Sequence, residues 1–108
     1  MAKRIGRGEI WMYEFRRPDK VRPVVVLTRD EVIDTMHTVL VAPVTSTIRG
    51  LRSEVKVGLA EGLKRESVAN LDHVASVERS KLTRYIGVLA VEKMRAVCLA
   101  LRFAAGCD

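Results

Sequence analysis

An arginine that directly precedes a proline, Arg22-Pro23, is the first candidate for chemistry in this sequence. The proline ring disfavours a helical conformation for the residue before it, so Arg22 projects from a defined point where a strand begins. Arg16, Arg17 and Lys20 precede it on a basic, turn-forming segment. The planar guanidinium group of Arg22 beside these cations could bind a phosphate group through two parallel hydrogen bonds. An arginine paired with a carboxylate at a strand end explains the same pattern equally well.

Three consecutive hydroxyl side chains form the second candidate. They stand at the end of a predicted strand and are followed by two arginines, the five residues being Thr45, Ser46, Thr47, Arg49 and Arg52. Hydroxyl and guanidinium groups are donors that bind phosphate and sugar oxygens in nucleic-acid complexes. Serine and threonine are also common in ordinary turns, so a turn without a ligand is the alternative interpretation.

Other catalytic groups are sparse. Nothing in the neighbouring sequence orients the ring of His37 or of His73, which disfavours a histidine pair for acid–base cleavage of RNA. The seven glycines are isolated, and the two cysteines and two histidines are scattered. We therefore expect no glycine-rich phosphate loop, no metal site and no cofactor. Cys98 is expected to be a small core residue and Cys107 an exposed thiol.

The charge balance favours a polyanionic partner. Nineteen Lys and Arg residues stand against thirteen Asp and Glu residues, a formal net charge of +6, and the excess is concentrated in the first 30 residues. A basic first third indicates nucleic-acid binding, although a basic protein without such a partner has the same composition. The chain has no apolar run of about 20 residues and no signal-peptide core at its start. We expect a cytoplasmic protein with no membrane association.

Alternating apolar and polar residues predict strands over most of the first 75 residues. We expect strands over 9–15, 23–28, 39–45 and 53–59, and a further strand from 67–72 and 74–77. We also expect a connection over 30–35 and a short helical turn over 80–85. Pro43 lies inside the third of these strands and indicates an edge, a bulge or the end of that strand. Trp11, Tyr13 and Phe15 share one strand face. Core packing is the favoured role for Trp11, stacking on unpaired bases is the alternative, and Phe15 remains open.

The hydrophobic period changes after Gly87. Helical spacing relates Val91, Met94, Val97, Cys98, Leu101 and Ala105, Gly106 supplies a stop signal, and Ala90 leaves the start of the helix without a side-chain cap. The predicted fold is mainly β (α+β): an SH3-like barrel of bent antiparallel strands with a C-terminal helix. One domain over 1–108, with a flexible tail over 1–6, accounts for the length. Exposed strand edges favour a dimer.

Five segments, in order along the chain, are similar to MazF/PemK-type toxins of bacterial toxin–antitoxin modules. They are 7–11, 21–27, 39–46, 67–72 and 86–89. Each segment alone is weak evidence for the family, but five segments in the same order over one domain length are a specific match. The resemblance implies a homodimer that cleaves single-stranded RNA at short sequence motifs without a metal ion, and that is inhibited by a cognate MazE-like antitoxin.

The resemblance also implies which residues act. It places the catalytic arginine of the family on Arg22 and the catalytic threonine on Thr45, and it makes the loop that holds Arg16, Arg17 and Lys20 an RNA contact. Metal-independent cleavage uses the ribose 2′-OH as nucleophile, and it leaves a 2′,3′-cyclic phosphate and a 5′-OH end. An arginine and a hydroxyl can stabilise the charge that builds up on the phosphorus-bound oxygens.

Two other functions fit the same fold. CcdB-type toxins share it, bind DNA gyrase through C-terminal residues and cleave nothing. The C-terminal residues here, Gly106-Cys107-Asp108, do not match their binding signature, whereas Arg22-Pro23 and Thr45 match the nuclease. A barrel that binds RNA without cutting it is the third possibility.

Overall fold

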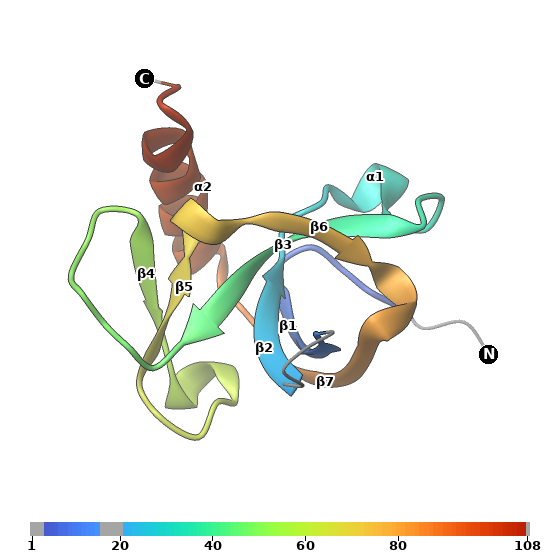
Figure 1. The fold of residues 1–108 in the computed structure, drawn as a ribbon, viewed down its shortest axis with the longest axis horizontal. Coiled ribbons are helices and arrows are strands. Elements are labelled where there is room, and N and C mark those ends of the chain that lie inside the picture. Colours follow the sequence, from blue (N-terminus) through green and yellow to red (C-terminus); the bar gives the residue numbers. More distant parts are fainter. Residues whose placement is uncertain (1–3, 16–20, 108) are drawn as a thin grey trace.

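The computed structural model describes residues 4–15 and 21–107. Figure 1 shows a strongly bent sheet with one long helix standing against its β4–β5 side. The strands are β1 (Glu9–Glu14), β2 (Val21–Val26), β3 (Thr38–Thr45), β4 (Glu54–Val57), β5 (Ser67–Asn70), β6 (Ala75–Glu78) and β7 (Leu82–Val88). The helices are α1 (Asp30–Ile33) and α2 (Val91–Ala105), with single 3-10 turns η1 (Leu59–Glu61), η2 (Leu71–His73) and η3 (Arg79–Lys81).

All the strand pairs are antiparallel, in the order β4-β5-β3-β2-β1-β7, with β6 also paired to β3. β3 therefore changes partner along one edge. Its residues 38–41 pair with β6, and Val44 and Thr45 pair with β5. Pro43 lies at this exchange, where its missing N–H interrupts neither ladder. The arrangement confirms the predicted fold class, mainly antiparallel β with a C-terminal helix.

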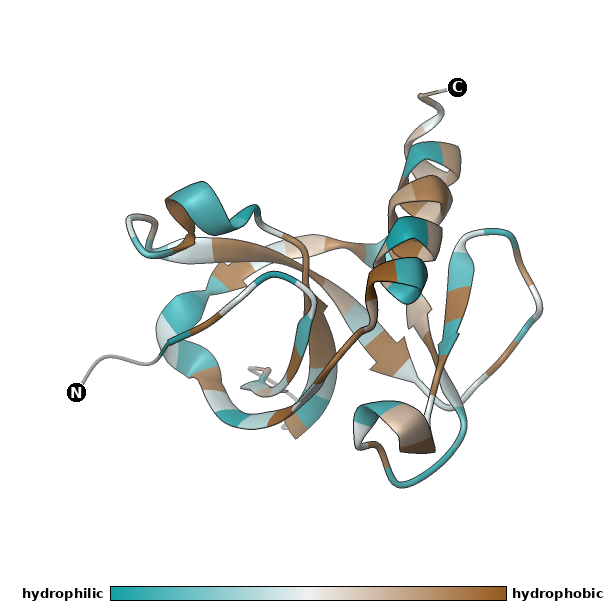
Figure 2. Cartoon of the chain, turned by 180° about the vertical axis from the view of Figure 1, so that it is seen from behind, coloured by the Kyte–Doolittle hydropathy of each residue, from teal (hydrophilic) through white to brown (hydrophobic). Residues whose placement is uncertain are grey.

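Both faces of the central strands are buried. Ile10 and Val25 pack with Val97 of α2 in one apolar cluster, whereas Trp11 and Val24 belong to a second cluster on the opposite face. Alternate residues of a strand point to opposite faces, so burial of both faces explains the continuous apolar run of β2. Figure 2 shows the same hydrophobic character along the central strands and a mixed character around α2.

The aromatic stripe is core, as predicted for Trp11. Trp11 and Tyr13 are both buried, and Phe15 packs against the same cluster. The rings of Tyr13 and Phe15 meet edge to face with centroids 4.7 Å apart, and those of Trp11 and Tyr85 do so at 5.9 Å. Trp11 and Tyr13, each 7% exposed, therefore leave almost no ring surface for base stacking.

The C-terminal helix begins and ends as predicted. Ala90 makes no capping hydrogen bond, Gly106 ends the helix with φ 71°, and Cys107 is exposed. The prediction that Cys98 is a core residue is wrong. The buried side of α2 follows Val97 and Ala100, and Cys98 lies one step around the helix from it, exposed and accepting a hydrogen bond from the Arg7 guanidinium at 3.1 Å.

Three other expectations need correction. The helical turn expected over 80–85 is a strand, because only η3 is helical and β7 follows at once. The register of β7 against β1 shifts twice, and these irregularities remove the alternation that predicts strands. The single strand expected from 67–72 and 74–77 is two strands separated by η2, and the connection expected over 30–35 contains α1.

The beginning of the described chain is anchored. Ile5 is 5% exposed in the second cluster, so residues 5 and 6 of the segment expected to be a flexible tail are part of the packed structure. Gly6 N–H donates to the Glu9 carboxylate at 2.9 Å, and Arg7 N–H donates to Asp30 Oδ1 at 2.8 Å. In the described residues, no helix has the length and apolar character to cross a membrane.

The turn η1 packs directly on the backbone of β7. A Cβ atom on Gly87 would overlap the carbonyl oxygen of Glu61, and one on Gly62 would lie 2.7 Å from the carbonyl oxygen of Ile86. The Glu61 side chain accepts from Gly58 N–H at 2.7 Å and pairs with Lys93 of α2 at 3.3 Å. These contacts fix the chain that follows η1, which forms one wall of the site described next.

Candidate functional site

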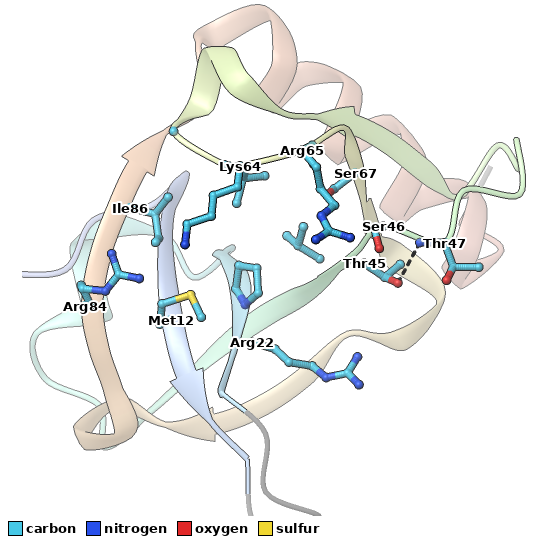
Figure 3. A pocket seen from close by; sticks show the side chains of 14 residues that line it. Met12, Arg22, Thr45, Ser46, Thr47, Lys64, Arg65, Ser67, Arg84 and Ile86 are labelled. Carbon is cyan, nitrogen blue, oxygen red and sulfur yellow. Dashed lines mark hydrogen bonds between the residues drawn. The ribbon is translucent and has the colours of Figure 1, made fainter.

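A cavity of about 540 Å³ opens between β2, the end of β3, the segment after η1 and β7. Figure 3 shows the polar side chains around it. Arg22 comes from β2, and Thr45, Ser46 and Thr47 come from the end of β3. Its apolar lining includes Met12, Leu63 and Ile86, and its remaining cations are Lys64, Arg65 and Arg84. A lining that combines apolar and cationic side chains suits a nucleotide, whose base is flat and whose phosphate is anionic.

A second cavity, of about 250 Å³, adjoins the first. Arg22, Val44, Thr45 and Thr47 line both cavities. The smaller cavity adds Pro43, Arg49, Asn70 and His73. Arg22 and Thr45, far apart in the sequence, therefore stand together at the junction of two cavities.

The position of Arg22 follows from its strand. It is the second residue of β2, its Cα partner on β1 is Tyr13, and Pro23 follows it. The side chain is exposed, and no carboxylate of the described residues lies within ion-pair distance of it. Within the described part of the chain, the strand-end ion pair that also explained its sequence context does not form.

Thr45 is oriented by its own turn. It is the last residue of β3 and half-buried. The N–H of Thr47 donates to Thr45 Oγ1 at 3.1 Å, the hydrogen bond drawn in Figure 3. Because the hydroxyl oxygen accepts this bond, its own proton can be donated to a ligand.

The loop after Thr47 is held by a carboxylate. The backbone N–H groups of Arg49, Gly50 and Leu51 donate to Glu54 Oε1 at 3.1, 2.9 and 3.3 Å. This fixes the position from which Arg49 reaches the smaller cavity. Arg52 lines neither cavity. Its side chain packs on α2, where the guanidinium carbon lies 4.2 Å from the ring centroid of Phe103.

The structure thus gathers five of the residues singled out in the sequence, which are Arg22, Thr45, Ser46, Thr47 and Arg49. Arg16, Arg17 and Lys20 lie outside the described residues. Sequence reasoning does not single out Lys64, Arg65, Arg84 or Asn70, and it disfavours an acid–base pair of His37 and His73. The adjacent cations of Lys64-Arg65 after a glycine turn were a local signal, whereas Arg84 lay in a segment that was wrongly expected to be helical.

The chemistry of the lining is cationic and hydroxylic. The described lining residues of the two cavities include no Asp or Glu. In the described part of the chain, no three His, Cys, Asp or Glu side chains are grouped so that they could hold a metal ion. Such a lining can bind a phosphodiester and stabilise additional negative charge on its oxygens.

Comparisons with known proteins point to one family. The family model described as "PemK-like, MazF-like toxin of type II toxin-antitoxin system" matches residues 6–104. "Probable endoribonuclease MazF5" of Mycobacterium tuberculosis (strain ATCC 25618 / H37Rv) is 46% identical over 104 residues, which are 95% of this chain and 94% of that protein. "Probable endoribonuclease MazF2" of Mycobacterium tuberculosis (strain CDC 1551 / Oshkosh) is 36% identical over 102 residues, 94% and 98% of the two chains.

Solved structures give the same result. The "Mycobacterium tuberculosis toxin MazF-mt6" is 35% identical with a TM-score of 0.86, covering 93% of this chain and 98% of that one. An "Endoribonuclease in complex with its cognate antitoxin from Mycobacterial species" has a TM-score of 0.87 at 20% identity, covering 97% and 98% of the chains. At that identity the second likeness supports the fold alone.

Proposed function

Because the chain belongs to the PemK-like, MazF-like toxins of type II toxin–antitoxin systems, we propose that it is an endoribonuclease toxin that cleaves single-stranded RNA without a metal ion. Membership confirms the resemblance recognised in the sequence. Proteins that match 77–95% of the chain at 36–46% identity are named endoribonucleases or probable endoribonucleases. The observation that carries the proposal is the junction of two cavities, where a guanidinium group and a hydroxyl stand together on a cationic surface.

In this mechanism the ribose 2′-oxygen attacks the adjacent phosphorus. The bond to the 5′-oxygen breaks, and a 2′,3′-cyclic phosphate and a 5′-OH end are left. Arg22 stabilises the charge that develops on the non-bridging oxygens, because its planar donors can meet two oxygens at once. Thr45 donates its hydroxyl proton to one of these oxygens and positions the scissile phosphate.

The neighbouring residues hold the rest of the strand. On one side of the junction, Lys64, Arg65 and Arg84 contact phosphates and Met12 lies beneath a base. On the other side, Arg49 contacts the continuing backbone, and Ser46 and Thr47 contact phosphate or sugar oxygens. Unpaired RNA fits this arrangement, because bases can enter the cavities only when they are free of a complementary strand.

The family also suggests partners. We propose that the chain forms a homodimer and that a cognate MazE-like antitoxin inhibits it. Large apolar side chains that stay exposed on the described surface are available for such contacts, among them Leu59, Val91 and Leu99.

Cleavage is expected to persist in EDTA. Cations and hydroxyls line the site, and this lining repels a divalent cation rather than coordinating it. Purified protein is incubated with mixed single-stranded RNA in EDTA, and the new 5′-OH ends are sequenced, which also supplies the recognition motif. Activity that is lost in EDTA and restored by a divalent ion contradicts the metal-independent mechanism. Tight RNA binding without new 5′-OH ends favours a barrel that binds RNA without cutting it. Binding to DNA gyrase, with neither RNA binding nor RNA cleavage, favours the CcdB-like function.

RNA affinity is expected to fall steeply with salt. If three or four of the cavity cations meet phosphates, the slope of log affinity against log salt for a single strand is about −2 to −3. The slope is measured by fluorescence anisotropy with 2′-O-methyl RNA, which lacks the nucleophile. The double change Lys64→Gln and Arg65→Gln removes two of these cations and is expected to reduce the steepness of the slope by about 1.4. Arg95→Gln, on α2 and away from both cavities, is the control, and equal slopes for the two variants contradict the proposed path.

A further inference from the structure

The cleavage reaction needs a group that accepts the proton of the 2′-OH. Arginine cannot serve, because its guanidinium group stays protonated in proteins, and a threonine hydroxyl is a poor base. A carboxylate is absent from the described lining of the two cavities. Among the described lining residues, His73 carries the one imidazole, the side chain that most often acts as a general base in enzymes.

His73 is placed at the site by a firmly held turn. It ends η2, whose residue Leu71 is buried and donates its N–H to the Ser53 carbonyl at 2.8 Å. Asn70 caps the turn by accepting from Asp72 N–H at 2.9 Å. Ser53 Oγ donates to Asp72 Oδ2 at 2.6 Å. The burial of Leu71 and these three hydrogen bonds hold the turn in place. The exposed imidazole of His73 lines the 250 Å³ cavity together with Arg22 and Thr45.

The charged groups around the imidazole are few. Arg22 of β2 and Arg49 of the β3–β4 loop share its cavity. Asp72 of its own turn is engaged by Ser53, and Glu54 of β4 is engaged by the backbone of residues 49–51. β3 contributes no charged side chain to the cavity, and α2, which also packs on η2, contributes no lining residue. No described carboxylate therefore competes with His73 for a proton at the cleavage point.

We propose that His73 is the general base of the cleavage reaction, an assignment that rests on the proposed function. The neutral imidazole accepts the 2′-OH proton as the 2′-oxygen bonds to phosphorus. The bond between phosphorus and the 5′-oxygen breaks with its electron pair on that oxygen, which takes a proton from water. The imidazolium then returns its proton to the solvent, so no net charge or atom is gained by the protein.

The test is single-turnover cleavage as a function of pH. If a side chain accepts the 2′-OH proton, the rate of the unmodified chain rises with pH as that base loses its own proton. His73→Gln is expected to cut the rate by about 10²-fold or more and to remove this rise. Affinity for 2′-O-methyl RNA stays within about twofold, because an exposed imidazole gives little of the binding energy. Added imidazole is expected to restore cleavage by His73→Ala.

His37→Gln is the matched control. His37 is exposed, lines neither cavity and lies beyond the opposite end of the β3–β6 ladder, so its variant keeps the normal rate and pH profile. A His73→Gln variant with the unmodified rate and pH profile overturns the assignment while leaving the endoribonuclease function intact. If His73→Gln is slow but cleaves RNA with a sulfur in place of the 5′-oxygen at the unmodified rate, the assignment is also overturned. A sulfur leaving group needs no proton, so this rescue would make His73 the general acid instead of the base. Absence of any cleavage by the unmodified chain overturns both proposals.

Discussion

Replacing Arg22 by lysine is expected to reduce single-turnover cleavage by about 10²-fold or more while changing RNA affinity much less. Lysine keeps the positive charge but loses the planar pair of donors. If the guanidinium group contacts the non-bridging oxygens most strongly in the transition state, this loss raises the barrier more than it weakens binding. Arg22→Ala is expected to be at least as impaired, by about 10³-fold.

Neither variant should affect folding, because the side chain of Arg22 is exposed and no described carboxylate depends on it. Cleavage rate, affinity for 2′-O-methyl RNA and melting temperature are measured for both. Arg95→Lys, an exposed arginine on α2, is the control for the same chemical change. Near-normal cleavage by Arg22→Lys rejects the bidentate contact. A large drop in the melting temperature of Arg22→Ala assigns the residue a structural role instead.

The second large effect concerns Gly87. Alanine there is expected to lower the free energy of unfolding by about 3 kcal/mol, which corresponds to a fall in Tm of about 10 °C or more. The added methyl group would overlap the carbonyl oxygen of Glu61. Moving η1 away from β7 would strain the contacts of the Glu61 side chain with Gly58 N–H and Lys93. Any shift of η1 also moves Lys64 and Arg65, so RNA binding weakens together with stability.

Gly50→Ala separates steric overlap from backbone strain. Gly50 has φ 73° and no atom within 4 Å of an added Cβ, so its replacement costs only the strain of a left-handed residue, about 1 kcal/mol. Thermal and denaturant unfolding of both variants gives the comparison. Equal stability losses for the two variants would contradict the close backbone contact between η1 and β7.

The sequence predicts the parts of the site that are determined locally. Arg22 and Thr45 stand at strand ends beside residues with strong conformational preferences, so their placement could be inferred without the tertiary structure. Pro43 is predicted to mark an edge, a bulge or the end of a strand, but it lies inside β3, at the point where β3 exchanges β6 for β5 as its partner. This exchange is a property of the whole sheet. The alternation of apolar and polar residues locates a strand but does not reveal which strands pair with one another.

The parts that sequence reasoning missed depend on distant segments. Lys64 and Arg65 enter the site because η1 is pressed against β7, and Arg84 does so because β7 pairs with β1 through two register shifts. His73 reaches the smaller cavity only because η2 separates two strands that were expected to be one. Cys98 has the spacing of a core residue but lies at the margin of a narrow buried stripe. Periodicity locates a helix better than it locates the limits of its buried side.

The hold of Glu54 on three successive N–H groups has a kinetic consequence. A loop tied in this way has few conformations to lose, so an RNA strand that meets Arg49 encounters a surface already in its binding arrangement. Association is then limited by collision and electrostatic attraction, with no slower step in which the loop must close. The rate of capture should therefore grow in proportion to RNA concentration without reaching a plateau, a behaviour typical of a preorganised surface.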